Sequence, residues 1–467
     1  MKLGSLAAGF VWALASLMAS GMAAPRDTTT SASSKRGLLS GLSRVSHDSS
    51  MGGQKASNMS SSLLSWLTNR DDIPHTAADV GSAEDAHEKI RRVHSKGQGS
   101  DSDNLLLESV CALVRVGLIP AGLVSVLDGY ADTRLDSVDN DNPPVSSNAA
   151  IYPSKKSDDA PYSVPEEKLR AAIQIPESFS YGKNGKKPVI LVPGTGVPAG
   201  LTYHFSFGKL AEAVPEADVL WVNIPRATLD DAQKNAEYVA YAINYISARS
   251  ATSNVSVLAW SQGALNAQWA LKYWPSTRDI VEDLILMSPD FHGSASRELV
   301  CPLLDPIACA PSIWQQGYGS DFIRTLRADG GDSAYVPTTS IYSTTDEFVQ
   351  PMSGDNASAL LSNAHHAGVT NNHLQDICSG QVAGGIYTHE GVLYNPVSWA
   401  LAVDALTHDG PGNVSRIDLD AACQRFLAPQ LELDDLLGTE GLLLVSTVEL
   451  LVYQPKMVHE PEIAGYA

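Results

Sequence analysis

Residues 255–269 read Val-Ser-Val-Leu-Ala-Trp-Ser-Gln-Gly-Ala-Leu-Asn-Ala-Gln-Trp. Their first part, Val255–Ala259, has the composition of a strand buried on both faces, and Ala264–Tyr273 has that of a helix. Ser261 stands between the two, with small residues two positions before and after it. Small neighbours suit a nucleophilic serine held in a strained strand-to-helix turn, the nucleophile elbow.

An ordinary strand-to-helix turn is the alternative, because Ser-x-Gly is common by chance. Here Ala259 replaces the glycine that usually precedes the serine, and Gly263 follows it. The next helix would direct free N–H groups and its positive dipole end at a developing oxyanion. The strand and helix on either side favour the elbow, so Ser261 is the predicted nucleophile.

Strands and helices alternate around this serine, a pattern typical of a mostly parallel sheet with helices on both faces. The other expected strands and the expected long helix are Val189–Val192, Val219–Val222, Leu284–Met287, Thr339–Tyr342 and Ala232–Ser247. Together with the elbow, this order predicts an α/β class protein with the α/β-hydrolase fold.

A serine hydroxyl needs a base, and the base needs a group that orients it. In this fold the acid and the histidine follow the serine in that order. The segment 342–346 reads as a strand ending in Asp346, the predicted acid, and Glu347 is the alternative. Six histidines follow: His365, His366, His373, His389, His408 and His459.

His389 opens a loop before a helix, which suits a histidine delivered to the sheet edge that carries the serine. His366 competes, because it also precedes a small residue and a glycine. Chain order and context leave both open, and the loop before a helix favours His389.

Composition excludes several classes of function. The 467 residues are 44% hydrophobic and 18% charged, which is ample for a large core. A net charge of −20 argues against a nucleic-acid partner, because phosphate binding needs a basic surface. No Cys or His cluster indicates a metal, and we expect no cofactor.

The N-terminus reads as an export signal over residues 1–23, with Lys2, an apolar core and a small-residue cleavage site. We therefore expect a secreted, extracellular protein. Residues 24–103 have the composition of a flexible or processed segment, which contains the dibasic pairs Lys35-Arg36 and Arg91-Arg92.

Residues 104–160 are expected to form a helical extension and a linker before the catalytic domain, 161–467. The stretch 105–131 carries an apolar face that should be buried. It is expected to cap the active-site face, and packing on the far side of the sheet is the alternative.

Export also permits disulfides and glycosylation. Of the five cysteines, Cys301 and Cys309 could close a short loop and Cys378 and Cys423 a longer one, which leaves Cys111. The candidate glycosylation sites, each in Asn-x-Ser, are Asn58, Asn254, Asn356 and Asn413.

Six segments between Lys187 and Ala405 resemble the fungal lipase B family, the Candida type. They are Leu191-Val-Pro-Gly-Thr-Gly196, Trp260-Ser-Gln-Gly263, Ser288-Pro-Asp-Phe291, Pro311-Ser-Ile-Trp-Gln-Gln316, Val336-Pro-Thr-Thr339 and Tyr342-Ser-Thr-Thr-Asp-Glu-Phe-Val-Gln-Pro351. Several are specific to that family rather than general to the fold.

The resemblance implies a triad of Ser261, Asp346 and His389, because His389-Glu-Gly391 matches the family's His-Ala-Gly segment and His366 does not. It also implies an oxyanion hole formed by Thr195 and Gln262, whose donors can converge on one oxygen.

Three further residues are implied to bind substrate: Trp260 at the base of the alcohol pocket, and Asp290 and Gln316 on the acyl side. A core aromatic is the alternative for Trp260, and a structural hydrogen-bonding role is the alternative for the other two. Cys378 and Cys423 match the family's cysteine pair around the histidine, whereas its other disulfides have no counterpart.

These observations predict a serine carboxylic-ester hydrolase of the triacylglycerol lipase type. It would act on esters or acylglycerols through an acyl-serine intermediate, with transient contact to a lipid interface. The alternatives are an acyltransferase with the same triad and a catalytically silent binding protein of this fold.

Overall fold

The computed structural model describes residues 80–97, 109–110, 112–113, 116–118, 134–145, 150–294 and 308–467. Several predictions fall outside these ranges: the export signal, the site at Asn58, the roles of Cys111 and Cys301, and most of the expected cap.

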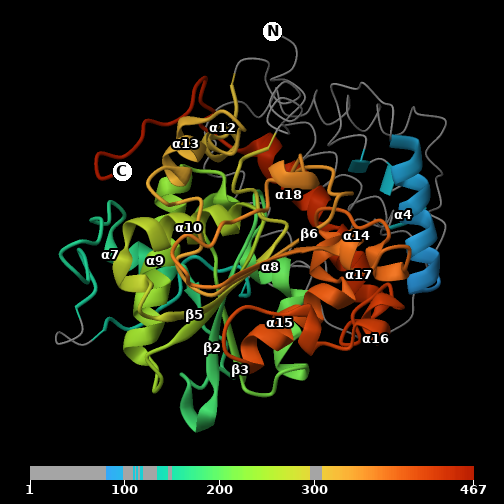
Figure 1. Cartoon of the computed structure of the whole chain (residues 1–467). Helices are drawn as coiled ribbons and strands as arrows, with labels where there is room; N and C mark the ends of the chain where they lie inside the picture. Colours follow the sequence, from blue (N-terminus) through green and yellow to red (C-terminus); the bar gives the residue numbers. More distant parts are fainter. Residues whose placement is uncertain are drawn as a thin grey trace, which may run out of the picture.

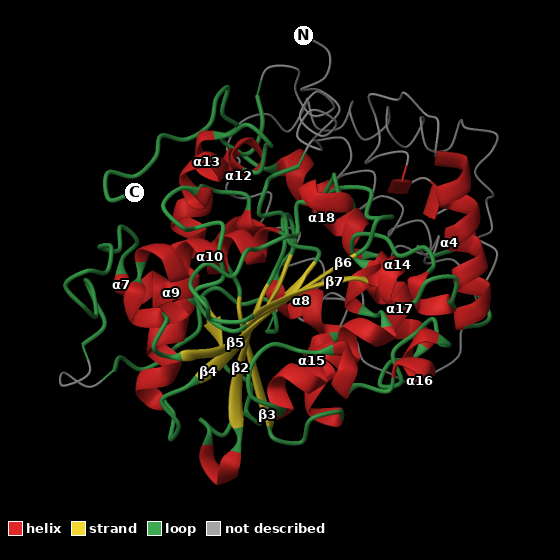
Figure 2. Cartoon of the chain, in the orientation of Figure 1, coloured by secondary structure: helices red, strands yellow, loops and turns green. Residues whose placement is uncertain are grey.

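The centre of the protein is a seven-stranded sheet in the order β1-β3-β2-β4-β5-β6-β7, in which only the β1–β3 pair is antiparallel (Figure 2). The strands are β1 (Ile173–Gln174), β2 (Lys187–Val192), β3 (Ala217–Val222), β4 (Val255–Trp260), β5 (Val281–Met287), β6 (Thr338–Tyr342) and β7 (Val369–His373). The predicted α/β-hydrolase fold is confirmed.

Twelve α-helices are placed within the described ranges. They are α4 (Ala83–Gly97), α7 (Glu166–Ala171), α8 (Ala199–His204), α9 (Ala232–Arg249), α10 (Gln262–Tyr273), α12 (Pro311–Gln315), α13 (Asp321–Arg327), α14 (Leu374–Ile377), α15 (Pro396–Thr407), α16 (Leu419–Cys423), α17 (Leu433–Glu440) and α18 (Leu442–Val452).

The sheet separates two hydrophobic cores, because successive strand residues point to opposite faces. In β2, Leu191 packs into the first core and Ile190 into the second, and in β4 Leu258 and Val257 divide in the same way. Helices α8, α15, α17 and α18 contribute to the first core, whereas α9 and α10 contribute to the second (Figure 1). This explains the continuous apolar runs Val189–Val192 in β2 and Leu284–Met287 in β5.

Two strands were not predicted. The antiparallel β1 has only two residues, and β7 has the polar sequence Val-Thr-Asn-Asn-His. Neither has the apolar run or the alternation by which strands are recognised. Both lie at the edges of the sheet, where less of each strand is buried.

Helix α4 lies in the segment expected to be flexible or processed. It is charged over most of its surface, and Ala86 and Ile90 are the residues it places in the first core. Such a narrow apolar stripe gives a weak signal in the sequence. The ring of His87 stacks on Phe426 with centroids 4.2 Å apart, so α4 packs against the C-terminal part of the chain.

Within residues 104–160, expected to form a helical extension and a linker, the stretch 134–145 lies against β3. Its Leu135 carbonyl accepts hydrogen bonds of 2.7 Å from Trp221 Nε1 and from Asn223 Nδ2.

Among the described helices, none is both long and apolar enough to cross a membrane.

Candidate active site

Ser261 lies at the turn between β4 and α10 with φ 56° and ψ −131°. This left-handed conformation is unfavourable for a residue with a side chain and is tolerated where surrounding structure enforces it. The Ser261 N–H donates to Met287 O on β5 at 2.9 Å, which anchors the turn to the sheet. The local geometry is that of the predicted elbow.

Close packing around the turn explains the small residues beside it. A Cβ added to Gly263 would lie 2.7 Å from the carbonyl oxygens of both Val192 and Pro193. A Cβ on Gly194 would lie 3.0 Å from Ser261 Cβ. Both glycines therefore allow the loop after β2 to approach the serine.

His389 connects the serine to the acid. Its Nε2 lies 2.8 Å from Ser261 Oγ, and its Nδ1 lies 2.7 Å from Asp346 Oδ2. Its backbone is also held, because the His389 carbonyl accepts from Trp260 Nε1 at 3.1 Å and from Ser288 Oγ at 3.2 Å. The structure thus brings together the three residues predicted as a triad.

Asp346 lies in a turn rather than at a strand end. The sequence predicts a strand ending in Asp346, whereas β6 ends at Tyr342. Asp346 Oδ1 accepts the backbone N–H groups of Phe348 at 2.9 Å and Val349 at 2.8 Å. These bonds stabilise the turn and leave Oδ2 directed at the imidazole.

The alternative acid, Glu347, contacts the same histidine at a different place. Its Oε2 accepts the backbone N–H of His389 at 3.0 Å. The other candidate base, His366, is exposed and precedes β7. His366 therefore lies near the amino-terminal ends of the parallel strands. Ser261 follows β4 and lies at their carboxyl-terminal ends, so His366 does not join this site.

Buried carboxyl groups surround the imidazole. Burial alone lowers the pKa of His389, but Asp346, Glu347 and Asp290 together raise it above its ordinary value. Burial also raises the pKa of Asp290 to about 7, and burial with the neighbouring Asp346 charge raises that of Glu347 to about 8. The site therefore favours a positively charged imidazole once a proton reaches it.

The residues implied to form an oxyanion hole lie together with Gln316. Thr195 Oγ1 lies 2.8 Å from Gln262 Oε1 and 3.0 Å from Gln316 Oε1, and Gln316 Nε2 donates to Gln262 Oε1 at 3.1 Å. Gln262 is the first residue of α10, so its backbone N–H has no acceptor within the helix. Gln262 directly follows Ser261 in the chain.

Trp260 and Asp290 also lie beside the histidine. The Trp260 ring centroid is 5.0 Å from that of His389, and the indole is buried. Asp290 is buried as well, and its Oδ1 has no hydrogen-bond partner within the described ranges. These positions agree with a substrate-binding role for both residues and also with the alternatives, a core aromatic for Trp260 and a structural role for Asp290.

A strained turn that contacts Gly194 and Gln262 was missed by sequence reasoning. Arg226, Ala227 and Thr228 have consecutive φ values of 60°, 50° and 62°. Thr228 Oγ1 donates to Gly194 O at 2.7 Å, and the Thr228 carbonyl accepts from Gln262 Nε2 at 3.1 Å. Three non-glycine residues in this conformation give no glycine signal by which the turn could be found.

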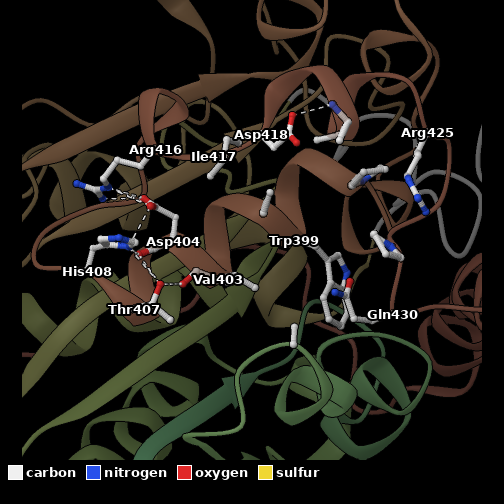
Figure 3. A pocket seen from close by; sticks show the side chains of 16 residues that line it. Trp399, Val403, Asp404, Thr407, His408, Arg416, Ile417, Asp418, Arg425 and Gln430 are labelled. Carbon is white, nitrogen blue, oxygen red and sulfur yellow. Dashed lines mark hydrogen bonds and ion pairs between the residues drawn. The ribbon is translucent and has the colours of Figure 1, made fainter.

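A surface pocket of about 420 Å³ lies elsewhere, between α15 and α16 (Figure 3). Its acidic group, Asp404, is ion-paired with Arg416 at 2.6 Å and lies 3.1 Å from His408. None of the three triad candidates lines this pocket. Within the described ranges, no cluster of three or more His, Cys, Asp or Glu residues could hold a metal ion.

Cys378 and Cys423 form the expected disulfide, which links the residue after α14 to the last residue of α16. Cys309 is also disulfide-bonded, and its partner lies outside the described ranges. Of the sequons, Asn356 is exposed, whereas Asn254 Nδ2 donates to Glu282 Oε1 at 2.6 Å and Asn413 Oδ1 accepts from Ser415 N at 2.9 Å.

Comparison with known proteins places this geometry in context. No family model matches the chain. Lipase B from Pseudozyma antarctica is 32% identical over 314 residues, which cover 66% of this chain and 86% of that protein. The crystal structure of Aspergillus fumigatus lipase B is 58% identical with a TM-score of 0.80, covering 92% of this chain and 99% of that one.

Proposed function

The chain belongs to the lipase B family and is an ester-hydrolysing serine lipase/esterase, and on this premise we propose that Ser261, His389 and Asp346 carry out the reaction. The 2.8 Å contact between His389 Nε2 and Ser261 Oγ, with Asp346 on the opposite ring nitrogen, is the observation that supports this assignment most.

In the first half of the reaction, Ser261 Oγ attacks the ester carbonyl carbon while His389 Nε2 takes the hydroxyl proton. The carbonyl double bond becomes an oxyanion, and Asp346 stabilises the imidazolium that has formed. The tetrahedral intermediate then collapses, the bond to the alcohol oxygen breaks, and His389 donates the proton to that oxygen. The acyl group remains on Ser261.

In the second half, water attacks the acyl-serine and His389 removes its proton. Collapse of the second tetrahedral intermediate releases the carboxylic acid, and Ser261 regains its proton from the imidazole. His389 takes part in every proton transfer of both halves.

Oxyanion stabilisation falls to Thr195 and Gln262. The Gln262 backbone N–H and the Thr195 N–H and hydroxyl are the donors, and removal of one such donor typically costs 10²–10³-fold in kcat, roughly, in serine hydrolases. The Thr195 hydroxyl turns from the Gln262 and Gln316 amide oxygens to the substrate oxygen. Gln316 and Asp290 lie on the acyl side, and Trp260 lies on the alcohol side.

The substrates we propose are acylglycerols, reached by transient contact with a lipid interface, and the enzyme acts after secretion. The sequence of residues 1–23, which is typical of an export signal, and the exposed sequon at Asn356 support this location. Treatment of the secreted protein with an endoglycosidase should reduce the mass of the peptide that contains Asn356.

The direct test is Ser261→Ala, with the exposed Ser178→Ala as a matched control. Release of p-nitrophenol from butyrate and octanoate esters should be abolished by the first change and unaffected by the second. A fluorophosphonate probe should label the wild type and the control only. Persistent hydrolysis and labelling in the folded Ser261→Ala variant would refute the assignment.

A further inference from the structure

Helix α18 carries a hydroxyl that bonds outside its own helix. Thr447 Oγ1 donates to Leu443 O one turn earlier, at 2.7 Å, as hydroxyls in helices commonly do. Ser446 Oγ instead donates to the backbone carbonyl of Thr195 at 2.9 Å, across 251 residues of sequence. Two adjacent hydroxyls on one helix thus have different partners.

This bond completes a set of three around Thr195. The Thr195–Gly196 peptide is held at its carbonyl by Ser446 and at its N–H by Ala227 O, which accepts at 2.8 Å. The preceding peptide is held at the Gly194 carbonyl by Thr228 Oγ1 at 2.7 Å. Because each peptide is planar, these bonds fix the rotations on both sides of Thr195.

Helix α18 also lies directly against the loop Gly194–Gly196, which follows β2 and contains Thr195; we call it the oxyanion loop. Gly196 has φ 75°, and a Cβ there would lie 3.0 Å from Ser446 Cα and would overlap its hydroxyl. Tyr453, the residue directly after α18, contacts the same turn: the Arg226 guanidinium lies 4.6 Å from the centroid of the Tyr453 ring. The loop is therefore enclosed between α18 and the turn Arg226–Thr228, and these two are in contact with each other.

We propose that Ser446 is a positioning residue for the oxyanion hole, which it maintains by holding the Thr195 carbonyl. The proposal rests on the role of Thr195 argued above. Ser446 contacts no reacting atom, and its effect is exerted through the direction of the Thr195 N–H and hydroxyl. In Figure 1, α18 (red) lies past the upper ends of the strands, where it reaches the loop after β2.

The transition state should depend on this bond more than the bound substrate does. The oxyanion forms only as the reaction proceeds, and small errors in donor position weaken its stabilisation. Loss of the Ser446 hydroxyl should therefore lower kcat and leave KM nearly unchanged, the signature of an interaction made in the transition state. Because Thr195 itself stays in place, the loss should be about tenfold, below that of a deleted donor.

The test compares Ser446→Ala with Thr447→Ala in the full chain, using p-nitrophenyl butyrate. Both changes remove one hydroxyl from neighbouring positions of α18, but only Ser446 bonds to the oxyanion loop. We expect kcat to fall about tenfold in Ser446→Ala and to stay within about twofold in Thr447→Ala. Ser446→Thr, which retains a hydroxyl, should recover most of the activity.

A second readout separates positioning from a general effect on stability. Phenylboronic acid forms a tetrahedral adduct with an active serine, so its inhibition constant should rise about tenfold in Ser446→Ala. Inhibition by butyrate, a planar product, should not change. Equal activity of Ser446→Ala and wild type, or equal losses in both alanine variants, would overturn the proposal. Wild-type activity that depends on Ser261 would show that the proposed function stands in either case.

Discussion

Glu347 Oε2 accepts the backbone N–H of His389 at 3.0 Å, while the neighbouring Asp346 binds the ring of the same histidine. Two consecutive acidic residues thus hold one histidine at two points. We predict that Glu347→Ala lowers kcat about tenfold, because the histidine loop loses an anchor and the imidazole shifts relative to Ser261.

The matched variant is Glu347→Gln, which keeps an oxygen acceptor of nearly the same shape. It should retain activity within about threefold, since the bond to the His389 N–H needs an acceptor and not a charge. Steady-state kinetics at pH 7 on both purified variants measure the difference. Comparable losses in the two would show that the charge, rather than the anchor, is required.

Gly263 provides a steric test of the elbow. Gly263→Ala places a methyl group 2.7 Å from the Val192 and Pro193 carbonyl oxygens, neither of which is a flexible side chain. We expect a loss of about 1–3 kcal/mol in stability and at least a tenfold loss of kcat as the turn moves. Gly465→Ala, where no atom of the described residues lies within 4 Å of the new atom, is the control and should change neither quantity.

Glu440 should make stability depend on pH. Its Oε1 accepts from Tyr394 OH at 2.8 Å and from Thr388 Oγ1 at 3.1 Å, and the buried Glu390 also faces it. Burial raises its pKa from 4.5 to about 7. Because the folded state holds the proton more tightly, this stability is fully present below pH 4.5 and is lost as pH rises through about 7.

Glu440→Gln removes the titration and keeps the Oε1 acceptor. Relative to wild type, the variant should gain on the order of 1–2 kcal/mol at pH 8 and little at pH 5. Urea denaturation at the two pH values measures this, with the exposed Glu177→Gln as control. A gain of the same size at both pH values would contradict the titration of Glu440.

The Cys378–Cys423 disulfide closes a loop with a sequence separation of 45 that includes His389. Replacing both cysteines by serine should cost roughly 4 kcal/mol by the chain-entropy model. Denaturation under non-reducing conditions measures this loss.

The second predicted disulfide joins Cys309 to Cys301. Peptide mapping without reduction should find these two cysteines in one linked peptide and should find Cys111 unlinked to either. A link from Cys111 to any of the other four cysteines would overturn that pairing.

The sequence predicted the parts of the protein that rest on local pattern. Apolar runs located β2, β3, β4 and β5, the alternation of strands and helices indicated β6, and the elbow motif located Ser261. Chain order alone left His366 as an alternative to His389, because the sequence does not show whether a loop lies at the amino-terminal or the carboxyl-terminal ends of the strands. The family resemblance resolved that choice.

Other parts depend on contacts that the sequence does not display. Ser446 has the sequence context of a plain helix residue, and its bond to Thr195 follows from how α18 packs. The turn Arg226–Thr228 contains no glycine, although all three residues are left-handed. Asp346 lies four residues beyond the end of its strand, in a turn that its own carboxylate stabilises by accepting the N–H groups of Phe348 and Val349.

The bond between Ser446 and Thr195 has a consequence for biosynthesis. Ser446 follows Ser261, Asp346 and His389 along the chain, so a ribosome exposes it after those residues. A growing polypeptide could assemble the sheet and the triad while α18 is still in the exit tunnel, since folding proceeds from the N-terminal side during translation. If Ser446 positions the oxyanion hole as proposed, the enzyme reaches its full kcat only when α18 packs against the loop that contains Thr195. An enzyme that cleaves lipids would then gain its activity late, after most of its chain has left the ribosome.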